Sequence, residues 1–242
     1  MNYSALRKNF LLSILLLFFG SHVLSQENVI EEVFVTAEKR SESLQDISQA
    51  VTAITDQDIE SKNIESILDL SAIVPGVTVA KNEGYKTVIS IRGVGNETNQ
   101  NAIAAPSVAF HMDGIFIASP FALQTDFIDV DRIEVIRGPQ GTLFGQNSTG
   151  GAINVISKRP SKGEYLGKSD ITIGNYGLTK FRSSNNIPLA QNAASRISVA
   201  ITERDGFSDN VVTGQDLDDA SSLSVRGDLL IDLNESSSLR FF

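Results

Sequence analysis

The 242-residue chain contains no cysteine and no tryptophan, and it has only two histidines. Without cysteine it has no disulfide, no thiolate metal site and no cysteine nucleophile. His22 lies in a segment that we expect to be removed, which leaves His111 as the one imidazole and makes most zinc sites unattainable. Acidic residues outnumber basic ones by 29 to 20, whereas nucleic-acid-binding proteins need a basic surface. We therefore expect no metal site, no cofactor and no nucleic-acid partner.

The N-terminus has the three parts of a secretory signal peptide. Arg7 and Lys8 give it a positive start, and the apolar run FLLSILLLFFG follows. Small residues stand at Val23 and Ser25, the −3 and −1 positions of a cleavage after Ser25. The apolar run is too short to cross a bilayer as a stable helix. The sequence therefore predicts a signal peptide over residues 1–25 and export of the remainder.

Residues 41–160 mix strand patterns with short helical ones. Strands are predicted at AVTAI, VTVA, TVISIRG, SVAFHMDG, RIEVIRG and GGAINVIS. Asp56 is expected to cap one short helix, and Ile64, Ile67, Leu68 and Leu70 form the apolar stripe of a second. The second helix should end at the residue before a proline, which is pushed out of the α region. This segment is predicted to be an α+β domain with a mixed sheet and short helices.

Residues 161–242 carry strand patterns only. In LSVRGDLLIDL the apolar residues Leu223, Val225 and Leu229 share one face, while Arg226 and Asp228 share the other. SRISVAITE alternates in the same way. Such period-two alternation over about ten residues is typical of transmembrane β-strands, although a soluble antiparallel sheet with one wet face fits it too.

The segment between the last two strands of the α+β domain is rich in glycine. RIEVIRGPQGTLFGQNSTGGAINVISKRP spans residues 132–160, with Gly138, Gly141 and Gly145 in a row. A phosphate-binding loop would need Lys and a hydroxyl residue after its glycines, and here a Phe-Gly-Gln sequence stands there. The residues instead predict a run of tight turns, because glycine adopts positive φ freely.

This glycine-rich block, together with ISIRGVG and HMDGIFI, resembles the plug domain of TonB-dependent outer-membrane receptors. The short β-prone stretch EEVFVTA resembles the TonB box, a segment that adds itself as a strand to the sheet of TonB. The resemblance covers essentially the whole chain. It implies a signal peptide (1–25), a TonB box and linker (26–40), a plug domain (41–160) and the first about five antiparallel strands of an incomplete transmembrane β-barrel (161–242).

The resemblance also assigns residues. The TonB-binding residues would be Glu31, Glu32, Val33, Phe34, Val35, Thr36 and Ala37. Arg92 and Arg137 match plug arginines that pair with barrel glutamates, which this chain does not contain. The plug-motif residues would be Gly93, Asp113, Gly114, Gly138, Gly141, Gly145, Gly150 and Gly151. No catalytic residue and no metal ligand is implied.

The implied function is energised uptake of a scarce nutrient, such as a ferric siderophore or a cobalamin-like complex, across the outer membrane of a Gram-negative cell. The partners would be the periplasmic domain of TonB, the outer membrane and a small-molecule or metal-chelate substrate. Substrate contacts would come from missing barrel loops and from plug loops near residues 81–86 and 95–105. An open sheet edge is not tolerated in the lipid bilayer, because its backbone groups have no hydrogen-bond partners there, and five strands cannot close a wide barrel. We therefore expect the chain to be a fragment or a truncated product.

Two other functions fit parts of the sequence. A plug-like domain alone would serve as a soluble periplasmic binding or regulatory module, but such a protein has no use for the alternating strands. A secreted hydrolase would use neighbouring acids such as Asp129 with Asp131 or Asp218 with Asp219. Consecutive carboxylates in a strand point to opposite faces, and carboxylates in a loop are usually solvated, so no acid–base geometry can be assigned to either pair.

Overall fold

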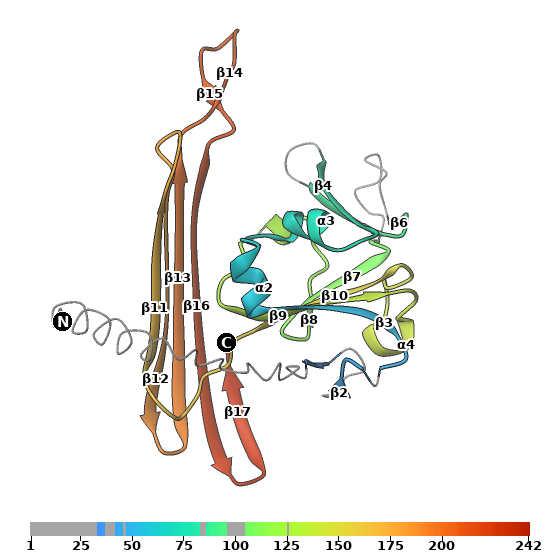
Figure 1. The fold of residues 1–242 in the computed structure, drawn as a ribbon, viewed down its shortest axis with the longest axis vertical. Helices are drawn as coiled ribbons and strands as arrows, with labels where there is room; N and C mark the ends of the chain where they lie inside the picture. Colours follow the sequence, from blue (N-terminus) through green and yellow to red (C-terminus); the bar gives the residue numbers. More distant parts are fainter. Residues whose placement is uncertain (1–32, 37–41, 46, 83–85, 96–104, 125) are drawn as a thin grey trace, which may run out of the picture. The chain divides into compact units, whose positions relative to one another are not determined.

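The computed structural model describes residues 33–242, apart from residues 37–41, 46, 83–85, 96–104 and 125 (Figure 1). The predicted signal peptide lies outside the described residues. So do Glu31, Glu32 and Ala37 of the predicted TonB box, and the tips of both predicted substrate loops.

Residues 50–157, here called the α+β part, are built on a five-stranded mixed sheet of order β3-β9-β10-β7-β8. Strands β10 and β7 are parallel, and the other neighbours are antiparallel. The strands are β3 (Ala50–Thr55), β7 (Val108–Met112), β8 (Ile115–Phe116), β9 (Val130–Arg137) and β10 (Gly151–Ser157). A three-stranded antiparallel sheet contains β4 (Val77–Asn82), β5 (Lys86–Ile91) and β6 (Val94–Gly95). The helices are α2 (Asp56–Ser61), η1 (Ile67–Asp69), α3 (Leu70–Ile73), η2 (Ala122–Gln124) and α4 (Gly141–Phe144).

Both faces of the five-stranded sheet are covered, and strand alternation decides which residues go where. Ile133 and Val135 of β9 enter the larger apolar cluster, which also contains residues of η1, α3, β4 and β5. Ile136, one position further along, enters a second cluster with Val35 and Phe144. Helices η1 and α3 and the smaller sheet therefore cover one face of the five-stranded sheet, and the N-terminal segment and α4 cover the other (Figure 1).

The two predicted helices form, but their details differ from the prediction. The N-cap of α2 is Thr55, not Asp56, because Thr55 has extended backbone and its hydroxyl accepts the backbone N–H of Asp58. The Asp58 carboxylate accepts the backbone N–H of Thr55 in return, which completes a capping box. The second helix is split into η1 and the four-residue α3, and Val74 before the proline is extended, as expected.

The glycine-rich segment contains one helical turn, α4, which the sequence did not predict. Around it, backbone packs closely against backbone. A Cβ on Gly151 would lie 2.2 Å from the Ile136 carbonyl oxygen, and one on Gly150 would lie 2.8 Å from that of Val94. The close approach needs glycine at both positions.

Residues 166–241, here called the strand part, form a second five-stranded sheet of order β11-β12-β13-β16-β17, antiparallel throughout. Its strands are β11 (Leu166–Ile173), β12 (Thr179–Ala190), β13 (Ala193–Arg204), β16 (Ala220–Asn234) and β17 (Ser237–Phe241). The connection from β13 to β16 carries a small hairpin of β14 (Ser208–Asp209) and β15 (Asp216–Leu217). Strands β11 and β17 are the open edges.

The predicted alternation is present in the strand part. Leu223 and Val225 of β16 are 69% and 66% exposed, whereas Asp228 on the other face is 4% exposed. Ser198 of β13 is buried on that polar face too. The sequence-based fold class is confirmed: an α+β domain is followed by antiparallel strands that do not close. No helix in the described ranges has the length and apolar character needed to cross a bilayer.

Candidate functional site

The segment Val33–Thr36 lies on the five-stranded sheet as a short strand. Strand β1 (Phe34–Val35) pairs antiparallel with β2 (Glu42–Ser43), and the Val33 carbonyl accepts the backbone N–H of Leu44 at 2.9 Å. Val35 is fully buried in the second apolar cluster, while Phe34 points outward and is half exposed. This part of the predicted TonB box is therefore docked through backbone pairing and one buried side chain.

A buried glutamate holds the next residue. The Glu134 carboxylate accepts the backbone N–H of Thr36 at 2.7 Å and its hydroxyl at 3.1 Å. Arg132 Nε donates to the same carboxylate at 2.9 Å, and Asn154 Nδ2 at 3.3 Å. A fully buried carboxylate needs such donors, since an unpaired buried charge is costly. Glu134 therefore connects the N-terminal segment to the middle of β9.

The two predicted lock arginines lie in different surroundings. Arg92 is exposed in the turn after β5, with φ of 52°. Arg137 ends β9, and its Nη2 donates to the Thr52 hydroxyl at 2.6 Å, while its Nε is buried without a hydrogen-bond partner. Neither arginine pairs with a carboxylate in the part of the chain that the structure describes. Their pairing with barrel glutamates stays a prediction.

Asp113 and Gly114 form the two-residue turn between β7 and β8. Both have positive φ, 50° and 84°, as a tight hairpin turn requires. The Asp113 carboxylate accepts the backbone N–H of Ser157 at 3.0 Å and its hydroxyl at 2.9 Å. The turn is thereby attached to the end of the neighbouring parallel strand β10. His111 of β7, the strand before this turn, packs against the rings of Phe116 and Phe144.

The other plug-motif glycines lie in turns of the α+β part or at the start of α4. Gly93, Gly138 and Gly145 have positive φ, while Gly141 begins α4 with open space beside it. These residues shape the backbone and bring no reactive group.

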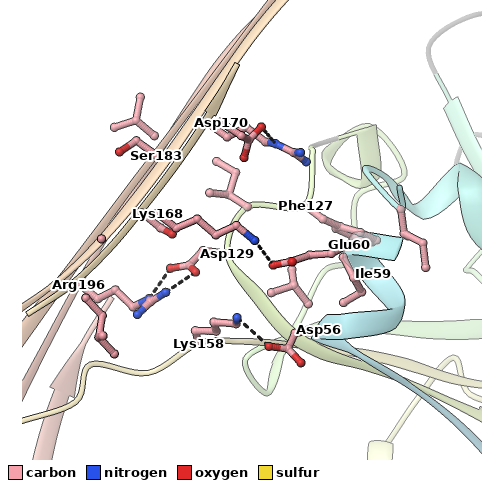
Figure 2. Close-up of a pocket in the computed structure, with 18 of the residues that line it drawn as sticks. Asp56, Ile59, Glu60, Phe127, Asp129, Lys158, Lys168, Asp170, Ser183 and Arg196 are labelled. Carbon is pink, nitrogen blue, oxygen red and sulfur yellow. Dashed lines mark hydrogen bonds and ion pairs between the residues drawn. The ribbon is translucent and has the colours of Figure 1, made fainter. Parts of the chain in front are cut away.

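Charged side chains connect the α+β part to the strand part. Figure 2 shows Arg196 of β13 on Asp129, and Lys168 of β11 on Glu60 of α2. Arg196 uses two nitrogens, with Nη2 at 2.6 Å from Asp129 Oδ1. These ion pairs border a cavity of about 580 Å³ that is lined by both charged and apolar side chains. The cavity thus has charges that already satisfy one another.

Asp56 and Lys158 form another ion pair at this cavity, at 2.9 Å (Figure 2). The hydrogen bond from Lys158 holds the pKa of Asp56 below its ordinary value, and it outweighs the opposing effect of burial. The hydrogen bond from Lys62 lowers the pKa of Asp58 in the same way.

The acidic side chains of the site are held in separate pairs. Within the described ranges, no three acidic or histidine side chains gather as metal ligands. In the first of the two acid pairs of the hydrolase alternative, Asp129 is engaged by Arg196 and Asp131 by Arg132. The contacts of this site hold segments of the chain together.

The sequence did not predict the contacts of Glu134, of Asp129 (named only as a candidate acid), or of the strand arginines Arg196 and Arg226. One signal was present for Glu134, since a carboxylate between Ile133 and Val135 in a buried strand must find donors. The partners of the others come from segments far apart in the chain, and no spacing reveals them.

The comparisons with known proteins agree with this arrangement. Residues 43–152 match the family model of the TonB-dependent receptor plug domain. A vitamin B12 transporter, BtuB of Vibrio vulnificus, is 29% identical over 185 residues, which are 73% of this chain and 28% of that protein. An iron-regulated outer membrane virulence protein of Vibrio cholerae is 33% identical over 134 residues, which are 53% of this chain and 20% of that protein. The chain thus spans about a quarter of the length of these curated relatives.

Solved structures share the fold. The ferripyoverdine receptor FpvA of Pseudomonas aeruginosa, bound to an iron-loaded pyoverdine, superposes with a TM-score of 0.70 at 22% identity, over 86% of this chain and 26% of that one. The ferric yersiniabactin receptor FyuA of Yersinia pestis gives a TM-score of 0.65 at 23% identity, over 75% of this chain and 28% of that one. Residues 43–152 therefore form a TonB-dependent receptor plug domain, and they are followed in this chain by a sheet of five antiparallel strands.

Proposed function

We propose that the chain acts as the N-terminal portion of a receptor that takes up a scarce nutrient with energy delivered by TonB. The family consists of transport receptors and not enzymes. Relatives are named for vitamin B12, iron regulation and pesticin, and structural neighbours for ferric siderophores, so the substrate class is a scarce metal chelate or cobalamin-like complex.

The observation that carries this proposal is the docked segment Val33–Thr36. It is already extended and already makes backbone hydrogen bonds of the kind that a strand-adding partner needs. Its attachment is small: a two-residue ladder, the Val35 side chain and the Glu134 carboxylate. A partner that offers a longer strand ladder competes with it directly.

The exposed apolar face of the strand part argues for the receptor over the soluble periplasmic module. Leu223 and Val225 are two-thirds exposed, and further large apolar residues of β11, β13 and β17 are exposed as well. Water penalises such a surface, whereas lipid does not. A free-standing plug module gains nothing from it.

The test uses a peptide of residues 26–40 and the periplasmic domain of TonB in calorimetry. Because recognition rests on backbone pairing, Val35→Pro should abolish binding, since proline removes a donor and fixes φ. Val35→Ala should retain most of it. Glu27→Pro, outside the predicted box, is the matched control and should bind like the unchanged peptide. Equal affinities for the unchanged and V35P peptides would overturn the proposed coupling role.

The same segment in the folded chain should bind more weakly than the peptide, because docking lowers the fraction that is available. Glu134→Gln weakens the hold on Thr36, because a neutral amide accepts less strongly than a carboxylate. The variant chain should therefore bind the TonB domain several-fold more tightly, approaching the peptide. An unchanged affinity would mean that Glu134 does not restrain the segment.

A further inference from the structure

Two aspartates of the plug have the same unusual conformation. Asp113, in the β7–β8 turn, and Asp129, just before β9, have φ of 50° and 54°. Their side chains are 1% and 5% exposed. Asn and Asp are the non-glycine residues that adopt left-handed backbone most readily. Since Asn would satisfy the backbone equally, the backbone does not explain why both positions carry a buried charge.

The charge of each aspartate is used by an arginine of the strand part. Asp129 receives Arg196 through two nitrogens, and it also accepts the Ser198 hydroxyl at 2.6 Å. Asp113 receives Arg226 Nη2 at 2.6 Å. A two-nitrogen arginine–carboxylate pair is geometrically specific, so it fixes orientation as well as distance.

The register of the strands joins these contacts into one patch. Arg196 of β13 lies opposite Asp228 of β16, and Ser198 lies opposite Arg226. Arg240 of β17 donates to Asp228 at 2.5 Å and extends the patch to the edge strand. Three arginines on the strands thus face one strand aspartate, and the two plug aspartates supply the charge that balances them.

The ion pairs between the plug and the strands named here all have the acid on the plug and the base on the strands. Lys168 pairs with Glu60 and Lys180 with Glu65, so the acid again belongs to the plug and the base to the strands. Lys168 and Glu60 are more than half exposed, and such pairs contribute little to stability. The pairs of Asp113 and Asp129 exclude water, and breaking one would leave a buried charge unpaired. In the predicted lock of Arg92 and Arg137 the base would instead belong to the plug and the acid to the barrel, and different plug residues would be used.

We propose that Asp113 and Asp129 are the docking residues that fix the plug to strands β13 and β16 through Arg226 and Arg196. This side of the plug is the last to separate from the strand part, because its buried ion pairs cost more to break than the exposed ones. Displacement of the plug then starts away from this side. The docking follows from contacts within the chain and does not depend on TonB, so its failure and the failure of the proposed uptake function are distinguishable.

The absence of cysteine from the chain makes a distance measurement direct. Ser61→Cys at the end of α2 and Ser221→Cys in β16, both exposed, take one spin label each. The labelled full chain in detergent micelles should give one narrow distance distribution by pulsed electron resonance. Asp113→Asn with Asp129→Asn should broaden it at least about twofold, since asparagine keeps the turns but removes both charges. Arg196→Gln with Arg226→Gln, made on the strand side, should broaden it equally.

Two controls separate this patch from ordinary surface charge. Asp58→Asn removes an ion pair with Lys62 that is 36% and 49% exposed, and should leave the distribution narrow. About 1 M NaCl, which screens exposed pairs, should also leave it narrow. Hydrogen exchange in β9 and β10 reports whether the plug stays folded in each variant. A distribution that stays narrow in the strand-side variant, or that salt alone broadens, would overturn the proposal.

Discussion

The plug and the strand part bury their apolar residues in opposite ways. In the plug, both faces of the five-stranded sheet are covered, one by helices and the smaller sheet, the other by the N-terminal segment and α4. In the strand part, the polar face meets the plug and the apolar face is exposed. The plug therefore carries its own hydrophobic stabilisation in water. The strands obtain theirs only where lipid or detergent covers the apolar face.

The largest expected effect is on the free energy of unfolding, when aliphatic side-chain atoms are removed from the plug and not from the strand part. Ile153 of β10 is fully buried in the larger cluster, and Ile153→Ala should cost about 2–5 kcal/mol of unfolding free energy because a cavity remains. Val225→Ala removes exposed methyl groups and should cost less than about 0.5 kcal/mol. Urea unfolding in detergent micelles, followed by hydrogen exchange in β9, measures both. Similar costs at the two sites would contradict the distinction between the regions.

A second test concerns how tightly the plug backbone packs. Gly151→Ala would place a Cβ 2.2 Å from the Ile136 carbonyl oxygen at a φ of 144°, so β9 and β10 must separate locally. The expected loss is about 1–3 kcal/mol. Gly141→Ala is the matched change, since nothing lies within 4 Å and α4 favours alanine. It should be neutral or stabilise by up to about 1 kcal/mol. Thermal midpoints of the two variants that fall equally would argue against close backbone packing as the reason for Gly151.

Much of this fold follows from local pattern. Period-two alternation predicts β13 and β16 and the polarity of their faces, because successive side chains in a strand must point opposite ways. The end of α3 follows from Pro75, which forces Val74 into extended backbone. Asp113 and Gly114, by contrast, stood at the end of a predicted strand, and the structure places them in the two-residue turn after β7.

What the sequence could not predict are contacts between distant segments. Thr36 and Glu134 are 98 residues apart, and Asp113 and Arg226 are 113 apart. Nothing local distinguishes Asp113 as a docking residue from Asp113 as a turn residue, because one side chain serves both. The cap of α2 was missed for a smaller reason: Thr55 and Asp56 are both good caps, and the capping box with Asp58 decides between them.

The smallest expected effect concerns an exposed ion pair between α2 and the end of the plug. Lys158 lowers the pKa of Asp56 below its ordinary value of 3.8 in the folded state. The pair therefore stabilises the plug fully above that value, and the stabilisation is lost as the pH falls through the lowered folded pKa. Because the Asp56 side chain is 43% exposed, solvent screens the pair and its contribution should be below about 0.5 kcal/mol. Urea midpoints of the unchanged chain and of Asp56→Asn should differ near neutral pH and converge in acid. Lys158→Gln should lose the same amount, and a difference that persists or grows as the pH falls would rule out the ion pair as its source.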